Sequence, residues 1–187
     1  MSEQRKIFID CGSYTGDTIS LFMKTPSYSK DYVIYSLEAA RSRIDIQKKT
    51  FKDLNIQYLA AVVWIYDGEI TFKQSTRRKG LADALFKNRL ASSEKDVILP
   101  CIDFSQWMLK NFVTNDYIVL KMDIEGAEVE VLRKMIDDAS IKLVKILYLE
   151  THGRRRMNKR GEIASLLSEL KKIEGLDLRG AIEKHKF

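Results

Sequence analysis

The chain has 187 residues, of which 45% are hydrophobic and 31% charged, values that suit a globular protein with a sizeable core and exclude a disordered chain. The net charge of +6 mildly favours anionic partners. No apolar run approaches the ~20 residues of a membrane-spanning helix, and the polar start of the chain lacks the apolar centre of a signal peptide, so a cytoplasmic location is expected.

The chain contains only two cysteines, Cys11 and Cys101, which are far apart in the sequence. They are too few for a disulfide framework or a zinc site, so both are expected to pack as small apolar residues. Because there is no repeat, no low-complexity tract and no Pro/Gly-rich linker, the sequence predicts one domain over residues 1–187.

Apolar runs alternate along the chain with segments of helical periodicity. In chain order the sequence predicts a strand over Lys6–Cys11, a helix from Asp17 to about Lys24, a strand over Tyr32–Leu37, a helix over 40–54, strands over 56–66 and 97–102, a helix from Asp103, a strand over Tyr117–Met122, a helix over 127–136, a strand over 143–149 and a helix over 162–173. Strands that alternate with helices indicate an α/β fold, Rossmann-like, with a mostly parallel twisted sheet and helices on both faces.

Four local features add detail to this pattern. Asp67 and Gly68 are expected to reverse the chain into a strand over 69–73, as in a β-hairpin. The polar stretch 74–96 has room for a helix over 81–90. Gln106 follows Asp103 at the spacing of a helix capping box. One or two short strands are expected after Leu176.

Ligands of parallel sheets bind outside the carboxyl ends of the strands, so the residues that follow each strand are the candidates for function. After the first strand, Gly12 and Gly16 allow a tight turn and a close approach to a ligand, and the helix that begins at Asp17 offers free N–H groups. An ordinary strand-to-helix turn carries the same residues, so this pattern alone does not choose between the two.

Carboxylates follow two further strands. Glu38 can accept hydrogen bonds from both hydroxyls of a ribose, or it can be a surface residue that opens the next helix. Lys121, Asp123, Glu125 and Glu128 crowd the exit of the Tyr117–Met122 strand. Such a cluster is either a functional site or a structural ion network, and its position favours a site.

The strand over 143–149 is followed by Glu150 and His152. His152 is either a structural histidine or a general base within reach of a ligand. Asp123, Glu150 and His152 include the ligand types of a divalent cation, but the sequence is interpreted as having no metal site. The basic stretches 77–79 and 154–160 are either solvated loops or a patch that faces a substrate.

Taken in order, these segments resemble the FkbM family of S-adenosylmethionine-dependent methyltransferases. Residues 121–128 (KMDIEGAE) are similar to that family's signature, and residues 8–17 (FIDCGSYTGD) to its first motif. Residues 36–38 and 147–152 resemble its second and fifth strands. The similarity covers about residues 7–153. The first loop departs from the family pattern, since it reads Gly-Ser-Tyr-Thr-Gly where Gly-Ala-Asn-x-Gly is commoner.

The resemblance implies a class I methyltransferase fold and O-methylation with S-adenosylmethionine as cofactor. Residues 12–17 would wrap the methionine part, Glu38 would hold the ribose, and Ala39 and Ala61 would flank the adenine. Asp123 and His152 are the candidate bases, with Lys121 or Glu150 orienting them. The cofactor contacts that it implies are Asp10, Gly12, Ser13, Tyr14, Thr15, Gly16, Asp17, Glu38, Ala39, Ala61 and Asp123.

A sugar or glycan hydroxyl is the acceptor that the resemblance favours, ahead of other hydroxylated natural products. Similar domains also occur fused to glycosyltransferases, so the chain is compatible with a module of a larger glycan-modifying protein. An RNA methyltransferase that grips phosphates with residues 154–160 ranks second, because no aromatic and basic platform is visible. A non-catalytic or dinucleotide-binding module is the third interpretation. No pattern in the sequence points to a particular oligomeric state.

Overall fold

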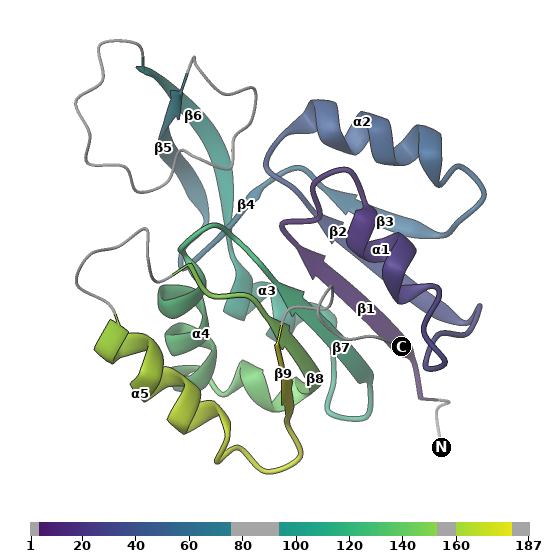
Figure 1. Cartoon of the computed structure of the whole chain (residues 1–187), viewed down its shortest axis with the longest axis vertical. Coiled ribbons are helices and arrows are strands. Elements are labelled where there is room, and N and C mark those ends of the chain that lie inside the picture. The colour runs from purple at the N-terminus through teal and green to yellow at the C-terminus, as the bar shows by residue number, and fades with distance from the viewer. Residues whose placement is uncertain (1–3, 76–93, 153–159, 181–187) are drawn as a thin grey trace.

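The computed structural model describes residues 4–75, 94–152 and 160–180 (Figure 1). The predicted helix over 81–90 and the basic stretches 77–79 and 154–159 lie outside these ranges. Within them, no helix has the length and apolar character needed to cross a bilayer.

The main sheet has six strands in the order β3-β2-β1-β7-β8-β9, and every neighbouring pair is parallel. Its strands are β1 (Lys6–Cys11), β2 (Tyr32–Leu37), β3 (Ile56–Leu59), β7 (Tyr117–Met122), β8 (Val144–Leu149) and β9 (Asp177–Arg179). The chain runs outward from β1 to β3 and then returns to β7 on the other side of β1. Ligands of parallel sheets bind at such a switch in strand order.

Helices cover both faces of this sheet, which confirms the predicted α/β fold (Figure 1). The helices α1 (Asp17–Phe22) and α2 (Arg41–Thr50) lie over one face. The other face is covered by α3 (Phe104–Asn111), α4 (Glu128–Asp137), the 3-10 helix η2 (Ser140–Leu143) and α5 (Arg160–Leu170).

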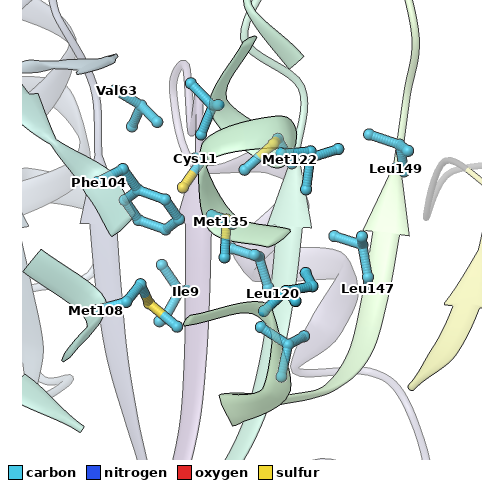
Figure 2. Packing of buried hydrophobic residues seen from close by; sticks show 14 of the residues in the cluster. Ile9, Cys11, Val63, Phe104, Met108, Leu120, Met122, Met135, Leu147 and Leu149 are labelled. Carbon is cyan, nitrogen blue, oxygen red and sulfur yellow. The ribbon is translucent and has the colours of Figure 1, made fainter. Parts of the chain in front are cut away.

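Alternate residues of β1 face two separate cores. Ile9 packs in the larger core with Met108 of α3 and Met135 of α4 (Figure 2). The preceding residue, Phe8, stacks on Phe22 of α1 with 4.0 Å between the ring centroids. Because the strand is buried on both sides, its sequence is a nearly continuous apolar run rather than an alternating one.

The single strand predicted over 56–66 is wrong, because the structure divides it into β3 and β4 (Val62–Trp64), which lie in different sheets. The ladder between β2 and β3 ends where Leu37 faces Leu59, so the chain beyond Leu59 has no partner strand there. It joins a second sheet of order β4-β6-β5, which contains β5 (Gly68–Ser75) and β6 (Glu94–Asp103).

The predicted hairpin at Asp67 and Gly68 is also wrong in its pairing. The chain reverses there, but β6 lies between β4 and β5, parallel to the first and antiparallel to the second. The two strands on either side of the turn are therefore not neighbours. Pairing with the distant β6 supplies the ladder that a local hairpin would have supplied.

Other local predictions agree with the structure. The Asp103 carboxylate accepts a hydrogen bond from the Gln106 backbone N–H at 3.1 Å and so caps α3. The Gln106 side chain does not complete the capping box, since it donates to Asp138 instead. Cys11 and Cys101 are buried and free, as expected of small apolar residues.

Candidate functional site

A cleft of about 350 Å³ opens where β1, β2 and β7 end, which is the switch point of the main sheet. This volume lies within the usual range for small-molecule sites, about 300–1,000 Å³. Residues from both halves of the sheet and from β4 and β6 line it: Gly12, Ser13, Tyr14, Asp17, Thr18, Leu37, Glu38, Ala39, Arg43, Ala61, Val62, Val63, Leu99, Lys121, Asp123, Ile124 and Glu125.

Both glycines of the loop after β1 have a positive φ and leave no room for a side chain, but each packs against a different neighbour. Gly12 has a φ of +77°, and a Cβ placed there would lie 1.9 Å from the backbone oxygen of Asp123. Gly16 has a φ of +93°, and a Cβ there would lie 2.3 Å from the ring of Phe51. Any side chain at position 12 would therefore push the first loop away from the loop that follows β7.

Glu38 lies at the end of β2, and only 5% of its surface is exposed. One carboxylate oxygen accepts hydrogen bonds from the N–H of Ala40 at 2.9 Å and from the Arg43 guanidinium at 3.3 Å. The other oxygen accepts the N–H of Tyr14 at 3.0 Å. A carboxylate oxygen has two lone pairs, so the second oxygen can accept one further hydrogen bond from a ligand.

Register places Asp10 of β1 directly beside Lys121 of β7. The Lys121 ammonium lies 3.2 Å from Asp10 and 3.5 Å from Asp123, and it donates to the Gly12 carbonyl at 2.9 Å. Burial lowers the pKa of Lys121, but the two carboxylates outweigh this effect and hold its pKa above the ordinary value. A charged Lys121 therefore ties the first loop to the β7 loop.

His152 lies behind Asp123, among carboxylates. Its Nδ1 lies 2.9 Å from Glu128, and its Nε2 lies 3.6 Å from Asp123 and 3.6 Å from Glu125. The hydrogen bond to Glu128 raises the pKa of His152, burial lowers it, and the net effect is a pKa above the ordinary value. Glu128 fixes the ring so that Nε2 faces Asp123.

Three of these residues also form a group that could hold a metal ion, among the residues that the structure describes. Asp123, Glu128 and His152 place ligand atoms within 4.8 Å of one another. In the sequence, which is interpreted as having no metal site, the residue considered beside Asp123 and His152 is Glu150 rather than Glu128. One oxygen of Glu128 already accepts the N–H groups of Ile124 and Gly126, both at 3.1 Å, besides its contact with His152. This oxygen of Glu128 is thus satisfied by groups of the protein itself, whereas Oδ1 of Asp123 is buried without a hydrogen-bond partner among the described residues.

The structure brings most of the sequence-predicted residues to one place. Those that line the cleft are Gly12, Ser13, Tyr14, Asp17, Glu38, Ala39, Ala61 and Asp123. Asp10, Thr15, Gly16 and His152 do not line it, although Asp10 contacts Lys121 and His152 lies beside Asp123.

Sequence reasoning gave no role to Arg43, which lines the cleft four residues after Ala39, or to Gln47, which supports the loop from below. Both lie on α2, and a charged helix offers no local signal for which of its polar residues turn inward. Glu128 was recognised only as one charge of a cluster, although it is 2% exposed and holds His152.

Fold and cleft together define a protein of the Rossmann-like α/β class with a ligand site at the switch point of its sheet. The sequence matches the methyltransferase FkbM domain over residues 10–174, so the chain belongs to the FkbM methyltransferase family. This confirms the resemblance read from the sequence motifs. No curated protein and no solved structure matches the chain at a significant level.

Proposed function

We propose that this methyltransferase uses S-adenosylmethionine to methylate a hydroxyl of a sugar or glycan in the cytoplasm. One observation carries the proposal: Gly12, Glu38 and Asp123, which directly follow three separate strands, line one cleft. A nucleotide-derived cofactor needs a loop that can lie close to it, a hydrogen-bond acceptor for its ribose hydroxyls and a polar group near its reacting end. These three positions supply those features in that order.

The residues present fit such a cofactor. Gly12 lines the cleft, and its lack of a side chain lets the first loop pack against the backbone of Asp123, which keeps both loops at the cleft. Glu38 retains one lone pair for a ribose hydroxyl. Ala39 and Ala61 are small, and with Val62 and Leu99 they give the β2 side of the cleft an apolar wall suited to adenine. Asp17 begins α1 close to the expected methionine end.

The charged residues of the cleft suit a positively charged cofactor. Asp17, Glu38, Asp123 and Glu125 contribute four carboxylates to its lining, against the two cations Arg43 and Lys121. A sulfonium carries one positive charge, which an acidic cleft favours.

S-adenosylmethionine supplies an activated methyl group, so the tasks left to the protein are alignment and removal of the acceptor proton. Alignment can contribute about 7–11 kcal/mol, and a positioned base about 10²–10⁴ in rate. Asp123 lines the cleft, which supports it as the base that takes the proton of the acceptor hydroxyl. His152 contacts Asp123 from behind and is the second candidate base. Lys121 and Glu128 hold these two side chains in place.

The proposal is tested by offering the protein S-adenosylmethionine with a deuterated methyl group, together with nucleotide sugars, glycans and short RNAs, and by analysing the products by mass spectrometry. The expected result is a labelled methyl ether on a sugar hydroxyl. A labelled RNA product that disappears at high salt would replace the sugar acceptor with the RNA interpretation. Label on a nitrogen or sulfur atom would contradict O-methylation.

A further inference from the structure

Three buried polar side chains form a closed group beneath the loop after β1. They come from three elements: Ser13 from the loop, Ser36 from β2 and Gln47 from α2, and at most 1% of each is exposed. The hydroxyls of Ser13 and Ser36 are 2.8 Å apart. The Gln47 amide lies 2.8 Å from the Ser13 hydroxyl and 2.7 Å from the Ser36 hydroxyl.

The direction of every hydrogen bond in this group follows from counting donors and acceptors. The carbonyl of Tyr14 only accepts, so the NH₂ of Gln47 faces it, at 2.8 Å. The amide oxygen of Gln47 then accepts from Ser36. The hydroxyl proton of Ser36 is used in that bond, so Ser36 can only accept from Ser13. Ser13 therefore donates to Ser36 and accepts from the second N–H of Gln47. The group is a ring in which all bonds run one way, an arrangement in which each bond polarises the next.

This ring holds the residue at the centre of the loop. Tyr14 has a φ of +49°, a left-handed conformation that non-glycine residues seldom adopt. Its carbonyl is bound by Gln47, its N–H is bound by Glu38 at 3.0 Å, and its ring lies 4.2 Å from the guanidinium carbon of Arg43. Two of these contacts come from α2, and the third comes from the residue that directly follows β2. A conformation of this kind persists where its surroundings determine it at several points.

We infer that Gln47 is a positioning residue for the cofactor loop: through its ring with Ser13 and Ser36 it keeps Tyr14 and the neighbouring N–H groups in the shape that binds S-adenosylmethionine. This inference rests on the proposed function. Gln47 does not line the cleft, so it acts on the ligand only through the loop. A loop that holds its binding shape in the free protein spares the ligand the entropy of ordering it, and affinity falls in proportion when that shape is less populated.

The test is Gln47→Met, which keeps the length of the side chain and removes its hydrogen bonds. The matched control is Gln57→Met, the same change at an exposed position of β3 that is not among the residues lining the cleft. Calorimetric titration with S-adenosylhomocysteine measures affinity, and hydrogen exchange of the amides at residues 12–16 measures the order of the loop in the free protein. Steady-state kinetics with S-adenosylmethionine separates KM from kcat.

We expect Gln47→Met to raise the Kd for S-adenosylhomocysteine about tenfold or more, as when the competent loop falls to about one-tenth of the population. The KM for S-adenosylmethionine should rise in parallel, kcat should change less than threefold, and the loop amides should exchange faster. Gln57→Met should leave all of these unchanged. A lower melting temperature with unchanged Kd, KM and loop exchange would reduce Gln47 to a purely structural residue and overturn the inference.

Ser36→Ala provides a milder variant if Gln47→Met does not fold. It removes one member of the ring and should produce the same changes, smaller in size. The two proposals also fail differently. If the unaltered protein does not bind S-adenosylhomocysteine, the proposed function fails, whereas the exchange rates of the loop amides still test whether Gln47 orders the loop. Equal exchange in Ser36→Ala and the unaltered protein would contradict the inference.

Discussion

The Glu38 carboxylate has a structural role and a proposed binding role. It holds the backbone N–H groups of Tyr14 and Ala40, and in the proposed function it also holds the ribose. Its position at the end of a strand was visible in the sequence, because Tyr32–Leu37 is a clear strand with a carboxylate directly after it. Its partner Arg43 was not visible, because only the folded start of α2 brings that side chain back to the cleft.

Replacing Glu38 should therefore weaken cofactor binding. Glu38→Gln keeps the size of the side chain but loses the charge, and hydrogen bonds to charged groups contribute about 1.5–3 kcal/mol. We expect the Kd for S-adenosylhomocysteine to rise about tenfold or more in a calorimetric titration. Glu69→Gln, the same change at an exposed residue that is absent from the cleft lining, is the control. An unaltered Kd in Glu38→Gln would remove the ribose role.

Exchange of His152 for alanine should separate catalysis from binding. His152 does not line the cleft, so His152→Ala should bind S-adenosylhomocysteine within about threefold of the original affinity. Turnover should fall by about 10²-fold or more, the size of a general-base contribution. Thermal unfolding of the variant serves as the check on folding. Normal turnover in His152→Ala would show that His152 neither accepts the proton nor supports Asp123 in catalysis.

The cluster of Asp123, Glu128 and His152 gives a prediction about metals. Because protein groups already occupy the inner oxygen of Glu128, we expect methyl transfer to proceed at the same rate, within twofold, after treatment with EDTA. The measurement is the initial rate before and after chelation and after addition of Mg²⁺ or Mn²⁺. Loss of activity on chelation and recovery with Mg²⁺ would assign a cation to this cluster.

At the scale of elements, the sequence predicted best where a strand is buried on both faces. The strands β1, β2 and β7 have the predicted bounds, because a short, mostly apolar run leaves little choice of ends. The predictions failed where pairing with a distant strand decided the outcome. The stretch 56–66 changes sheet after Leu59 because β2 ends there, and no residue within the stretch carries that information.

The entrance of β7 provides a test of this architecture. Asp116 lies directly before β7, is 2% exposed, and accepts hydrogen bonds from Arg5 at 2.8 Å and from the Val113 N–H at 2.8 Å. Burial raises the pKa of Asp116, but these donors outweigh burial and hold its pKa below the ordinary value. The folded state thus favours the ionised form, and this contribution to stability is complete above about pH 4 and is lost as pH falls further.

We expect Asp116→Asn to lower the free energy of unfolding at pH 7 by about 1.5–3 kcal/mol, because charged hydrogen bonds at the start of two neighbouring strands are weakened. The difference between the variant and the unaltered protein should shrink as pH falls from about 4 toward 2, since both then carry a neutral side chain. Urea unfolding at several pH values measures it. A difference that stays constant over that range would rule out the ionised Arg5–Asp116 pair as its source.

At the scale of the whole molecule, net charge proved a poor guide to the site. The chain is basic overall, with a charge of +6, yet the cleft is lined by four carboxylates and two cations. Composition sums over the entire chain, whereas the fold gathers Asp17, Glu38, Asp123 and Glu125 from three separate places in the sequence. The order of the motifs in the sequence predicted a cleft. The register of β1 and β7 places Asp10 beside Lys121, and the sequence alone did not predict this pair.

The central claim is that this cleft binds the adenosyl and methionine parts of one cofactor. Calorimetric titration of the protein with S-adenosylhomocysteine, NAD and NADP tests it most directly. The account predicts one site per chain for S-adenosylhomocysteine and no measurable heat of binding for either dinucleotide. Binding of NAD without binding of S-adenosylhomocysteine would contradict it.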